Sequence, residues 1–121
     1  MSDNTEALSP VQIEAAIRDT ANRIAASVRV CADRYTVFLT ADREYDRAYA
    51  AAYMRADGPQ HERKYAAELA TTQEREVRDV ADASYRYADR QAKALENELR
   101  ALQSCNASVR AQYAVAGRGE F

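Results

Sequence analysis

The fold of this chain is decided by residues 81–113, which read ADASYRYADRQAKALENELRALQSCNASVRAQY. The stretch contains no Gly and no Pro, the two residues that most often interrupt a helix. Apolar or small side chains recur every seven residues in two interleaved series. The first series is Ala81, Ala88, Leu95, Leu102 and Val109, and the second is Tyr85, Ala92, Leu99, Asn106 and Tyr113. A seven-residue repeat held for this long predicts a helix that packs along a partner helix with a left-handed supercoil.

The first half of the chain carries the same kind of repeat. Ser9, Pro10 and Gln12 predict a helix start, because Ser caps, Pro fits the first helical position and Gln reaches back in a capping box. One series is Ile17, Ile24, Cys31, Phe38, Tyr45 and Ala52, and its predicted companion, four residues on, is Ala21, Val28, Tyr35, Asp42, Tyr49 and Ala56. We therefore expect a long helix over residues 10–56.

Residues 57–72 separate the two repeats. Asp57-Gly58-Pro59 is a strong stop, because Gly suits a left-handed helix end and Pro cannot continue the helix. A short helix is expected over residues 61–70. Thr71 and Thr72 either cap a second long helix over residues 72–116, or are passed through so that the two helices merge.

The predicted architecture is all-α: an antiparallel coiled-coil-like hairpin of two long helices with a short helix at the turn. Residues 10–117 are expected to form one helical domain. Residues 1–9 are expected to be a flexible N-terminus, and residues 118–121 a tail after the helix end at Gly117.

The apolar stripe is wider than a simple two-helix seam requires. A third series on the second helix is Val80, Tyr87, Ala94, Ala101, Ser108 and Val115, and the first helix is widened by Val30, Val37 and Leu39. A stripe this wide needs more than one partner helix. Either the short helix covers it, or two hairpins pair into a four-helix assembly, and we favour the homodimer.

Two polar residues, Asp42 and Asn106, interrupt the predicted seams. Counting from the turn places Asp42 level with residues 85–90, and Asn106 level with residues 22–24. A polar residue at a core heptad position can fix the register or the oligomeric state. We interpret both residues as register-setting, with a polar pocket for a partner as the alternative.

The composition narrows the classes of function. The 121 residues include 17 basic and 19 acidic side chains, for a net charge of −2, so charge does not predict non-specific nucleic-acid binding. The N-terminus lacks the basic and apolar regions of a secretory signal, and no apolar stretch approaches the ~20 residues that span a bilayer. We expect a cytoplasmic protein with no membrane contact, in which Cys31 and Cys105 are buried thiols rather than a disulfide.

No pattern of catalytic or metal-binding residues is found. His61 is the one histidine, and no Cys or pair of carboxylates stands beside it to complete a zinc site. The acidic run Asp42, Glu44 and Asp46 lacks the Gly of a calcium-binding loop, and 3 Gly are too few for a phosphate-binding loop. We expect no enzyme activity, no metal and no cofactor.

Tyrosines and basic residues interleave near the turn. Because several tyrosines fall on seam positions, the candidates for an exposed interaction patch are Tyr53, Arg55, Arg63, Lys64, Tyr65 and Tyr87. Aromatic platforms combined with Arg and Lys are typical of single-strand nucleic-acid binding. We favour core or interface packing for the rings of all eight tyrosines, with this exposed patch as the alternative.

Parts of the sequence resemble small helical proteins encoded by phages of actinobacteria. The resemblance is carried by residues 49–54, 64–72, 87–104 and 108–113, and its most distinctive part is SVRAQY at residues 108–113. It implies a phage accessory protein encoded near single-strand-binding and recombination functions. It carries over no catalytic residues.

Together these features predict a non-enzymatic helical accessory protein. It would act through a self-associating coiled-coil surface, as a homodimer, and on a host or phage protein that the sequence does not identify. The alternative is a nucleic-acid-binding accessory protein in phage recombination or replication, with the tyrosine and arginine patch as its binding site.

Overall fold

The computed structural model describes residues 8–119, with side chains up to residue 117. Its elements are three helices: α1 (Pro10–Arg55), α2 (Gln60–Ala70) and α3 (Thr72–Gly119). No strand occurs in this range, so the predicted all-α class is confirmed for the described residues. The predicted flexible segment 1–9 and tail 118–121 lie largely outside these residues, since 1–7, 120 and 121 are not described.

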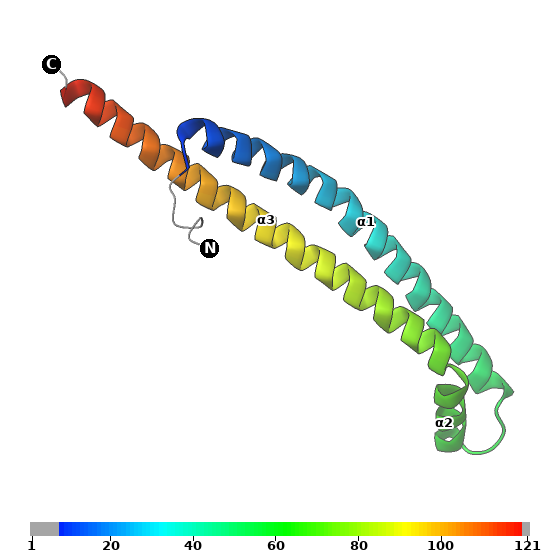
Figure 1. The fold of residues 1–121 in the computed structure, drawn as a ribbon. Coiled ribbons are helices and arrows are strands. Elements are labelled where there is room, and N and C mark those ends of the chain that lie inside the picture. The colour runs from blue at the N-terminus through cyan, green and yellow to red at the C-terminus, as the bar shows by residue number, and fades with distance from the viewer. Residues whose placement is uncertain (1–7, 120–121) are drawn as a thin grey trace, which may run out of the picture. The chain divides into compact units, whose positions relative to one another are not determined.

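The chain divides into two compact units, and both long helices contribute to each of them. Of the residues that the structure describes, 8–28 and 91–119 form the terminal unit, and Arg29–Arg90 form the central unit. In each unit α1 and α3 lie side by side, and α2 belongs to the central unit (Figure 1). This arrangement fits a helical hairpin.

Contacts between α1 and α3 define their pairing within each unit. In the terminal unit, Glu14 lies 3.8 Å from Arg110 and Arg23 lies 4.0 Å from Glu98. In the central unit, the rings of Tyr35 and Tyr85 are 5.0 Å apart between centroids. In the same unit a carboxylate oxygen of Asp42 lies 4.0 Å from Arg78. Later residues of α1 therefore face earlier residues of α3 in both units.

The start of α1 has the predicted capping box. The backbone N–H of Ser9 donates to Oε1 of Gln12 at 2.9 Å, and the backbone N–H of Gln12 donates to Oγ of Ser9 at 3.2 Å. Each of these bonds satisfies a backbone donor that the first turn of a helix leaves without an intrahelical partner. The predicted N-terminus of the first long helix is thus confirmed.

Burial along α3 follows the two predicted series, apart from the exposed Tyr113. Along α1, the series from Ile17 to Ala52 is also buried or half-buried, but the predicted companion series is wrong over its first half. Val28 and Tyr35 are exposed. The residues that face α3 instead lie three positions, rather than four, after each member of the series that starts at Ile17. They are Thr20, Ser27, Arg34, Ala41 and Ala48. In a heptad the inward positions are separated by alternating steps of three and four residues. Because the residues three positions on are mostly polar or small, the sequence pattern did not indicate the step of three.

The turn between α1 and α2 confirms the predicted role of Gly58. α1 ends at Arg55, one residue before the predicted end, and α2 begins at Gln60. Gly58 has a φ of 102°, and no other described residue has a positive φ in this structure. A side chain in this left-handed region meets its own backbone, so Gly is favoured there.

Replacing Gly58 by Ala is expected to lower the free energy of unfolding by about 1–2 kcal/mol, because an L-residue is strained at this φ. The new Cβ would also lie 2.8 Å from Oε2 of Glu62, a flexible group that can move aside. Chemical denaturation followed by circular dichroism measures the loss. The matched control is Gly117→Ala in α3, where nothing lies within 4 Å. It is expected to stabilise the helix by about 0.8–1 kcal/mol, and a loss there as well would contradict the backbone argument.

Thr71 separates α2 from α3, so the two helices do not merge. Its hydroxyl donates to the carbonyl of Ala67 at 2.7 Å, and the hydroxyl of Thr72 donates to the carbonyl of Leu69 at 3.1 Å. The two threonines therefore satisfy carbonyls at the end of α2. Of the two predicted alternatives, the separate helix from residue 72 is confirmed, but the threonine hydroxyls bond to α2 and do not cap α3. Such back-bonding by Ser and Thr bends a helix path.

The C-terminal end of α3 lies beyond the predicted position. The helix continues through Gly117 to Gly119 instead of ending at residue 116. Gly117 is part of the helix and does not take the left-handed conformation of a C-cap. Gly lowers helix stability by about 1 kcal/mol, which does not by itself end a helix.

No helix within residues 8–119 combines the length and the apolar character that a membrane span requires.

Candidate interaction surface

An apolar hollow of ≈ 570 Å³ lies between α1 and α3 in the central unit. Its apolar walls are Val37 from α1 and Val77 and Val80 from α3, which are 59%, 52% and 70% exposed. Ala81 and Ser84 continue it along α3, and Gln73 and Glu76 border it. The three valines lie next to one another on one open face, so they form a continuous apolar surface rather than scattered apolar residues.

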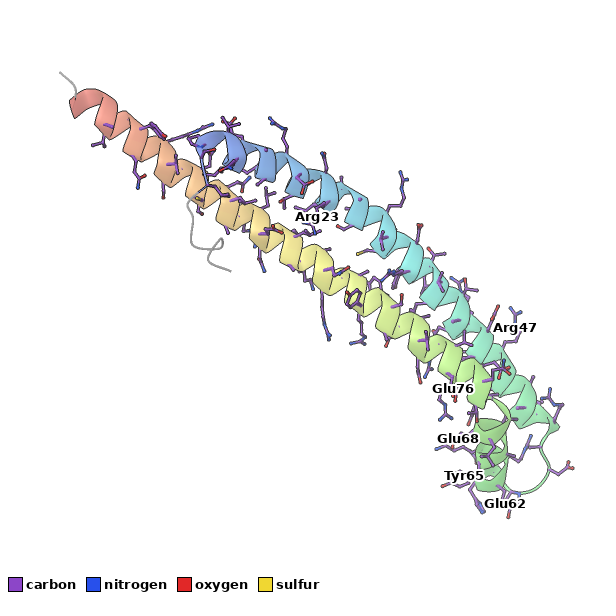
Figure 2. All side chains as sticks on the ribbon, viewed as in Figure 1. Arg23, Arg47, Glu62, Tyr65, Glu68 and Glu76 are labelled. Atoms are coloured by element: carbon purple, nitrogen blue, oxygen red, sulfur yellow. The ribbon has the colours of Figure 1, made fainter. Side chains whose placement is uncertain are left out.

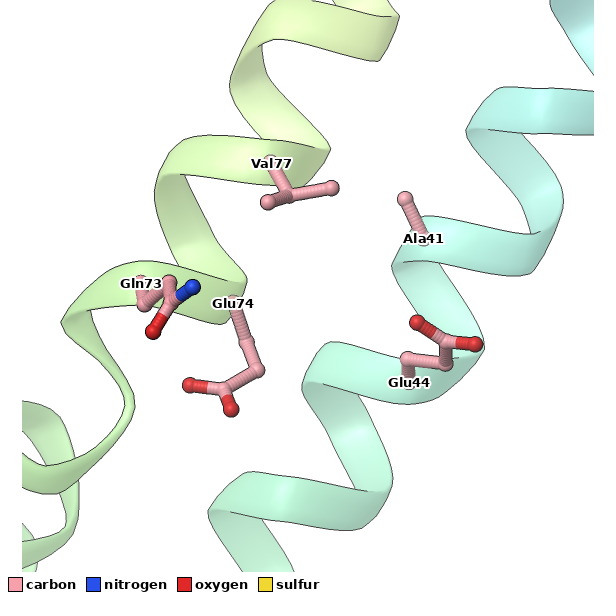
Figure 3. Close-up of a pocket in the computed structure, with 5 residues that line it drawn as sticks. All are labelled: Ala41, Glu44, Gln73, Glu74 and Val77. Atoms are coloured by element: carbon pink, nitrogen blue, oxygen red, sulfur yellow. The ribbon is translucent and has the colours of Figure 1, made fainter.

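A second hollow, of ≈ 240 Å³, continues the first toward the start of α3. The two hollows share Gln73 and Val77, so together they form one groove, which we call the α1/α3 groove. Figure 3 shows Val77 and Ala41 opposite each other, with Glu44 and Glu74 at the far end. The groove is thus apolar along its middle and acidic at one end.

The groove coincides with part of the wide stripe predicted from the sequence. Val80 belongs to the third seven-residue series of α3, and Val37 is one of the residues that widen the stripe on α1. Leu39, also assigned to the wide stripe, is half-buried instead. None of the residues that line the two hollows comes from α2, so the short helix leaves this part of the stripe uncovered.

The predicted tyrosine and arginine patch is only partly assembled. The guanidinium of Arg63 lies 4.6 Å from the ring centre of Tyr53, and its Nε and Nη2 donate to the Tyr53 carbonyl at 3.4 and 3.2 Å. Lys64 joins Tyr53 in lining a hollow of ≈ 610 Å³, together with Tyr49, Gln60 and His61.

The other three members of the patch are spread over different helices. Arg55 is exposed at the end of α1, and Tyr65 is exposed on α2 (Figure 2). Tyr87 is exposed on α3, about one turn beyond Ser84. Tyr87 thus lies near the α1/α3 groove in sequence, rather than with the residues of α2.

Three tyrosines near the end of α1 form a row in which arginines cover the first and last rings. Tyr45, Tyr49 and Tyr53 follow one another with ring centroids 6.1 and 6.5 Å apart. Arg78 stands over Tyr45 at 4.4 Å, as Arg63 does over Tyr53. These cation–π contacts hold both guanidinium groups against the protein's own rings. The row therefore contributes to packing between helices.

Asp42 lies near the seam but does not face the predicted residues. Its partner is Arg78, rather than a residue between 85 and 90, and its side chain is 41% exposed. The prediction of its level along α3 was wrong by about two to three turns. The last turns of α1 pack against α2, as Tyr53 does against Arg63, so the start of α3 pairs with an earlier part of α1 than expected. A partly exposed pair at 4.0 Å contributes little to stability.

Arg34 makes a polar contact between α1 and α3 that was not predicted from the sequence. It is half-buried, and its Nη1 donates to the backbone carbonyl of Ser84 at 3.1 Å. The tilted ring pair of Tyr35 and Tyr85 involves the next residue on each helix. An arginine in a heptad is ordinarily assigned to the solvent face, so the residue was missed. Its position in the series with Thr20 and Ala41 is the signal that could have identified it.

Asn106 is half-buried in the terminal unit. The pairs Glu14–Arg110 and Arg23–Glu98 bracket it, so it lies level with the turn of α1 that follows Glu14. The predicted level at residues 22–24 is therefore wrong. The role of Asn106 in setting the register stays a prediction.

Across residues 8–119, no group of three His, Cys, Asp or Glu side chains is placed to hold a metal ion. Both cysteines are free thiols: Cys31 is half-buried, whereas Cys105 is exposed. The prediction that both thiols are buried was wrong for Cys105.

Comparisons with known proteins were made for the whole chain. No protein-family model, no curated protein and no solved structure matches it significantly.

Proposed function

We propose that this chain is a non-enzymatic helical interaction protein that associates with a second copy of itself through the α1/α3 groove. The observation that supports the proposal is the row of exposed valines, Val37, Val77 and Val80, between two helices. Water is excluded from such a face when another helix packs into it, and this is the main driving force of protein association. In this proposal the long helices form an antiparallel coiled coil.

The resemblance to phage proteins gives the proposal its setting. A small helical protein with an uncovered apolar groove suits an accessory role, in which it assembles on itself and on a host or phage protein. We place this role in the cytoplasm of the host. The residues of the resemblance, 64–72 and 87–104, flank the α3 side of the groove.

The size of the apolar face bears on the form of the association. Covering a partly exposed Val contributes about 1–2 kcal/mol, so the three valines contribute about 3–6 kcal/mol. Association costs at least about 4 kcal/mol in lost translational and rotational freedom. A stable complex therefore requires contacts beyond the three valines.

Nucleic-acid binding, the alternative, has weaker support. Its platform would need open ring faces and free cations. Arg63 is instead held over Tyr53 and by the Tyr53 carbonyl. The remaining cations of the patch, Arg55 and Lys64, make a small positive surface on a chain of net charge −2.

Replacing Val80 by Glu tests the proposal. Light scattering with size exclusion, over a range of concentrations, is expected to give wild-type particles of at least twice the chain mass of 13.5 kDa. Val80→Glu puts a charge into the apolar contact and is expected to weaken association at least about tenfold, which corresponds to 1.4 kcal/mol. The matched control is Met54→Glu, an exposed apolar residue of the same unit outside the groove. A wild-type mass of 13.5 kDa at every concentration would overturn the proposal.

A further inference from the structure

The apolar surface of the α1/α3 groove extends beyond its two hollows. Tyr87 follows Val80 by seven residues on α3, and Val30 precedes Val37 by seven residues on α1, so each lies on the same side of its helix as the groove valine. Tyr87 is 58% exposed and Val30 is 41% exposed. Both belong to the central unit, as the groove does. We call the five exposed apolar residues on this side the groove face: Val30, Val37, Val77, Val80 and Tyr87.

The contacts between α1 and α3 show which of their residues are level with each other. Arg34 donates to the carbonyl of Ser84, and Asp42 pairs with Arg78. Counting along the antiparallel helices from either contact places Val80 level with residues 38–40 of α1. Figure 3 agrees, since it shows Ala41 opposite Val77.

A polar stripe on α1 borders the groove face. It consists of Asp33, Thr40 and Arg47, which follow one another at steps of seven residues and are all exposed. Asp33 and Thr40 each lie three residues after a valine of the groove face, Val30 and Val37, and residues at that spacing are neighbours on a helix surface. A partner that covers the valines therefore also meets this stripe.

The polar stripe is complementary to itself when it is reversed. It runs from an acidic residue, through the uncharged Thr40, to a basic residue. Among the residues that the structure describes, neither Asp33 nor Arg47 pairs with an opposite charge of its own chain. A second copy related by a two-fold axis at Thr40 brings Asp33 of each copy to Arg47 of the other. A parallel second copy would instead place like charges together, which opposes association.

The exposed residues of α3 are centred at the same level. Gln73, Val80 and Tyr87 also follow one another at steps of seven residues, with Val80 in the middle. A two-fold axis at Val80 places the two Val80 side chains together, and the amide of Gln73 beside the ring and hydroxyl of Tyr87 of the other copy. Because Val80 is level with residues 38–40, one axis serves both helices.

We infer that two copies pair through the groove face about a two-fold axis at Thr40 and Val80, with Asp33 of each copy against Arg47 of the other. This inference rests on the proposed self-association and specifies its geometry and its charge pairs. Glu44 lies three residues before Arg47, so the guanidinium stands between its own Glu44 and Asp33 of the other copy. Both copies bury the same face in such a contact, which supplies the contacts beyond the three groove valines that a stable complex requires.

Charge reversal tests the pairing. Asp33→Arg and Arg47→Asp, made separately in the full-length chain, are each expected to weaken association about tenfold, because two attractive pairs become repulsive. The double variant carries both changes and restores opposite charges in both pairs. It is expected to associate within about threefold of wild type, as coupled residues do in a double-mutant cycle. Light scattering with size exclusion at low salt, where screening is weakest, measures the association.

The matched controls are Asp46→Arg and Arg43→Asp, which change the charge equally at exposed residues of α1 outside the stripe. Both are expected to associate as wild type does, and circular dichroism is expected to show all variants equally helical. If the single reversals have no effect, or the double variant does not recover, the inference fails while self-association stands. A wild-type mass of 13.5 kDa at every concentration would mean that the proposed function fails as well.

Cysteine cross-linking locates the axis, in a chain whose Cys31 and Cys105 are replaced by Ala. Val80→Cys is expected to form a disulfide between copies on mild oxidation, because a residue on the axis meets itself within disulfide distance. Gln73→Cys is expected to remain a thiol, because the two copies of residue 73 lie about 20 Å apart along the helices. A disulfide at residue 73, or none at residue 80, would overturn the inferred geometry.

Discussion

Replacing Ile13 by Ala is expected to lower the free energy of unfolding by about 2–5 kcal/mol. Ile13 is 0% exposed and lies in the first turn of α1, where its backbone N–H donates to the Ser9 carbonyl at 2.9 Å. The other buried apolar residues of the described chain are alanines, so Ile13 is the large side chain that anchors this end of the helix. Its truncation removes buried methyl groups and leaves a cavity that the neighbouring helix can only partly fill.

Urea denaturation followed by circular dichroism at equilibrium measures this loss. The control is Val11→Ala, two residues earlier on the same helix and exposed. It is expected to change stability by no more than about 0.5 kcal/mol, as surface substitutions usually do. Equal losses for the two variants would show that burial of Ile13 is not what stabilises the start of α1.

Replacing Ala88 by Leu is expected to lower the free energy of unfolding by about 1–3 kcal/mol, through overpacking. Ala88 is 4% exposed and belongs to the series of α3 that faces α1 in the central unit. Ala41 on α1 and Ala81 on α3 are similarly buried, and small side chains at such positions let two helix backbones approach closely. The added Leu atoms would have to separate the helices or adopt strained rotamers.

Thermal and urea denaturation of Ala83→Leu provide the comparison for Ala88→Leu. Ala83 lies on the same helix but is exposed. Leu and Ala differ little in helix propensity, so this control is expected to be nearly neutral. A stabilised Ala88→Leu variant would mean that a void lies beside Ala88, which would contradict close approach of the helices.

Features that depend on neighbouring residues were predictable from the sequence. The capping box of Ser9 and Gln12 and the left-handed Gly58 are decided within a few residues of chain, by local hydrogen bonds and backbone sterics. The inward face of α3 was predictable for a related reason. Its heptads carry apolar or small residues at nearly every inward position, so the pattern on that helix has one interpretation.

The inward face of α1 and the pairing of the helices were decided by the tertiary structure. Thr20 and Arg34 face α3, whereas the apolar Val28 is exposed, because the companion series lies three residues on and not four. Asp42 meets Arg78 because the last turns of α1 pack against α2, which leaves the start of α3 to pair with earlier residues of α1. A slip of one helical turn keeps every local preference intact, so local pattern cannot distinguish such pairings.

The candidate interaction surface was likewise predictable in part from the sequence and in part only from the tertiary structure. The sequence by itself determined that α3 carries an apolar stripe too wide for one partner, since the third series can be counted from Val80 to Val115. Only the tertiary structure decided where the stripe is covered and where it stays open, at Val37, Val77 and Val80 and again at Tyr113 and Val115. The physical reason is that exposure depends on where the neighbouring helix begins, ends and turns, and those positions are set by contacts between residues far apart in the chain.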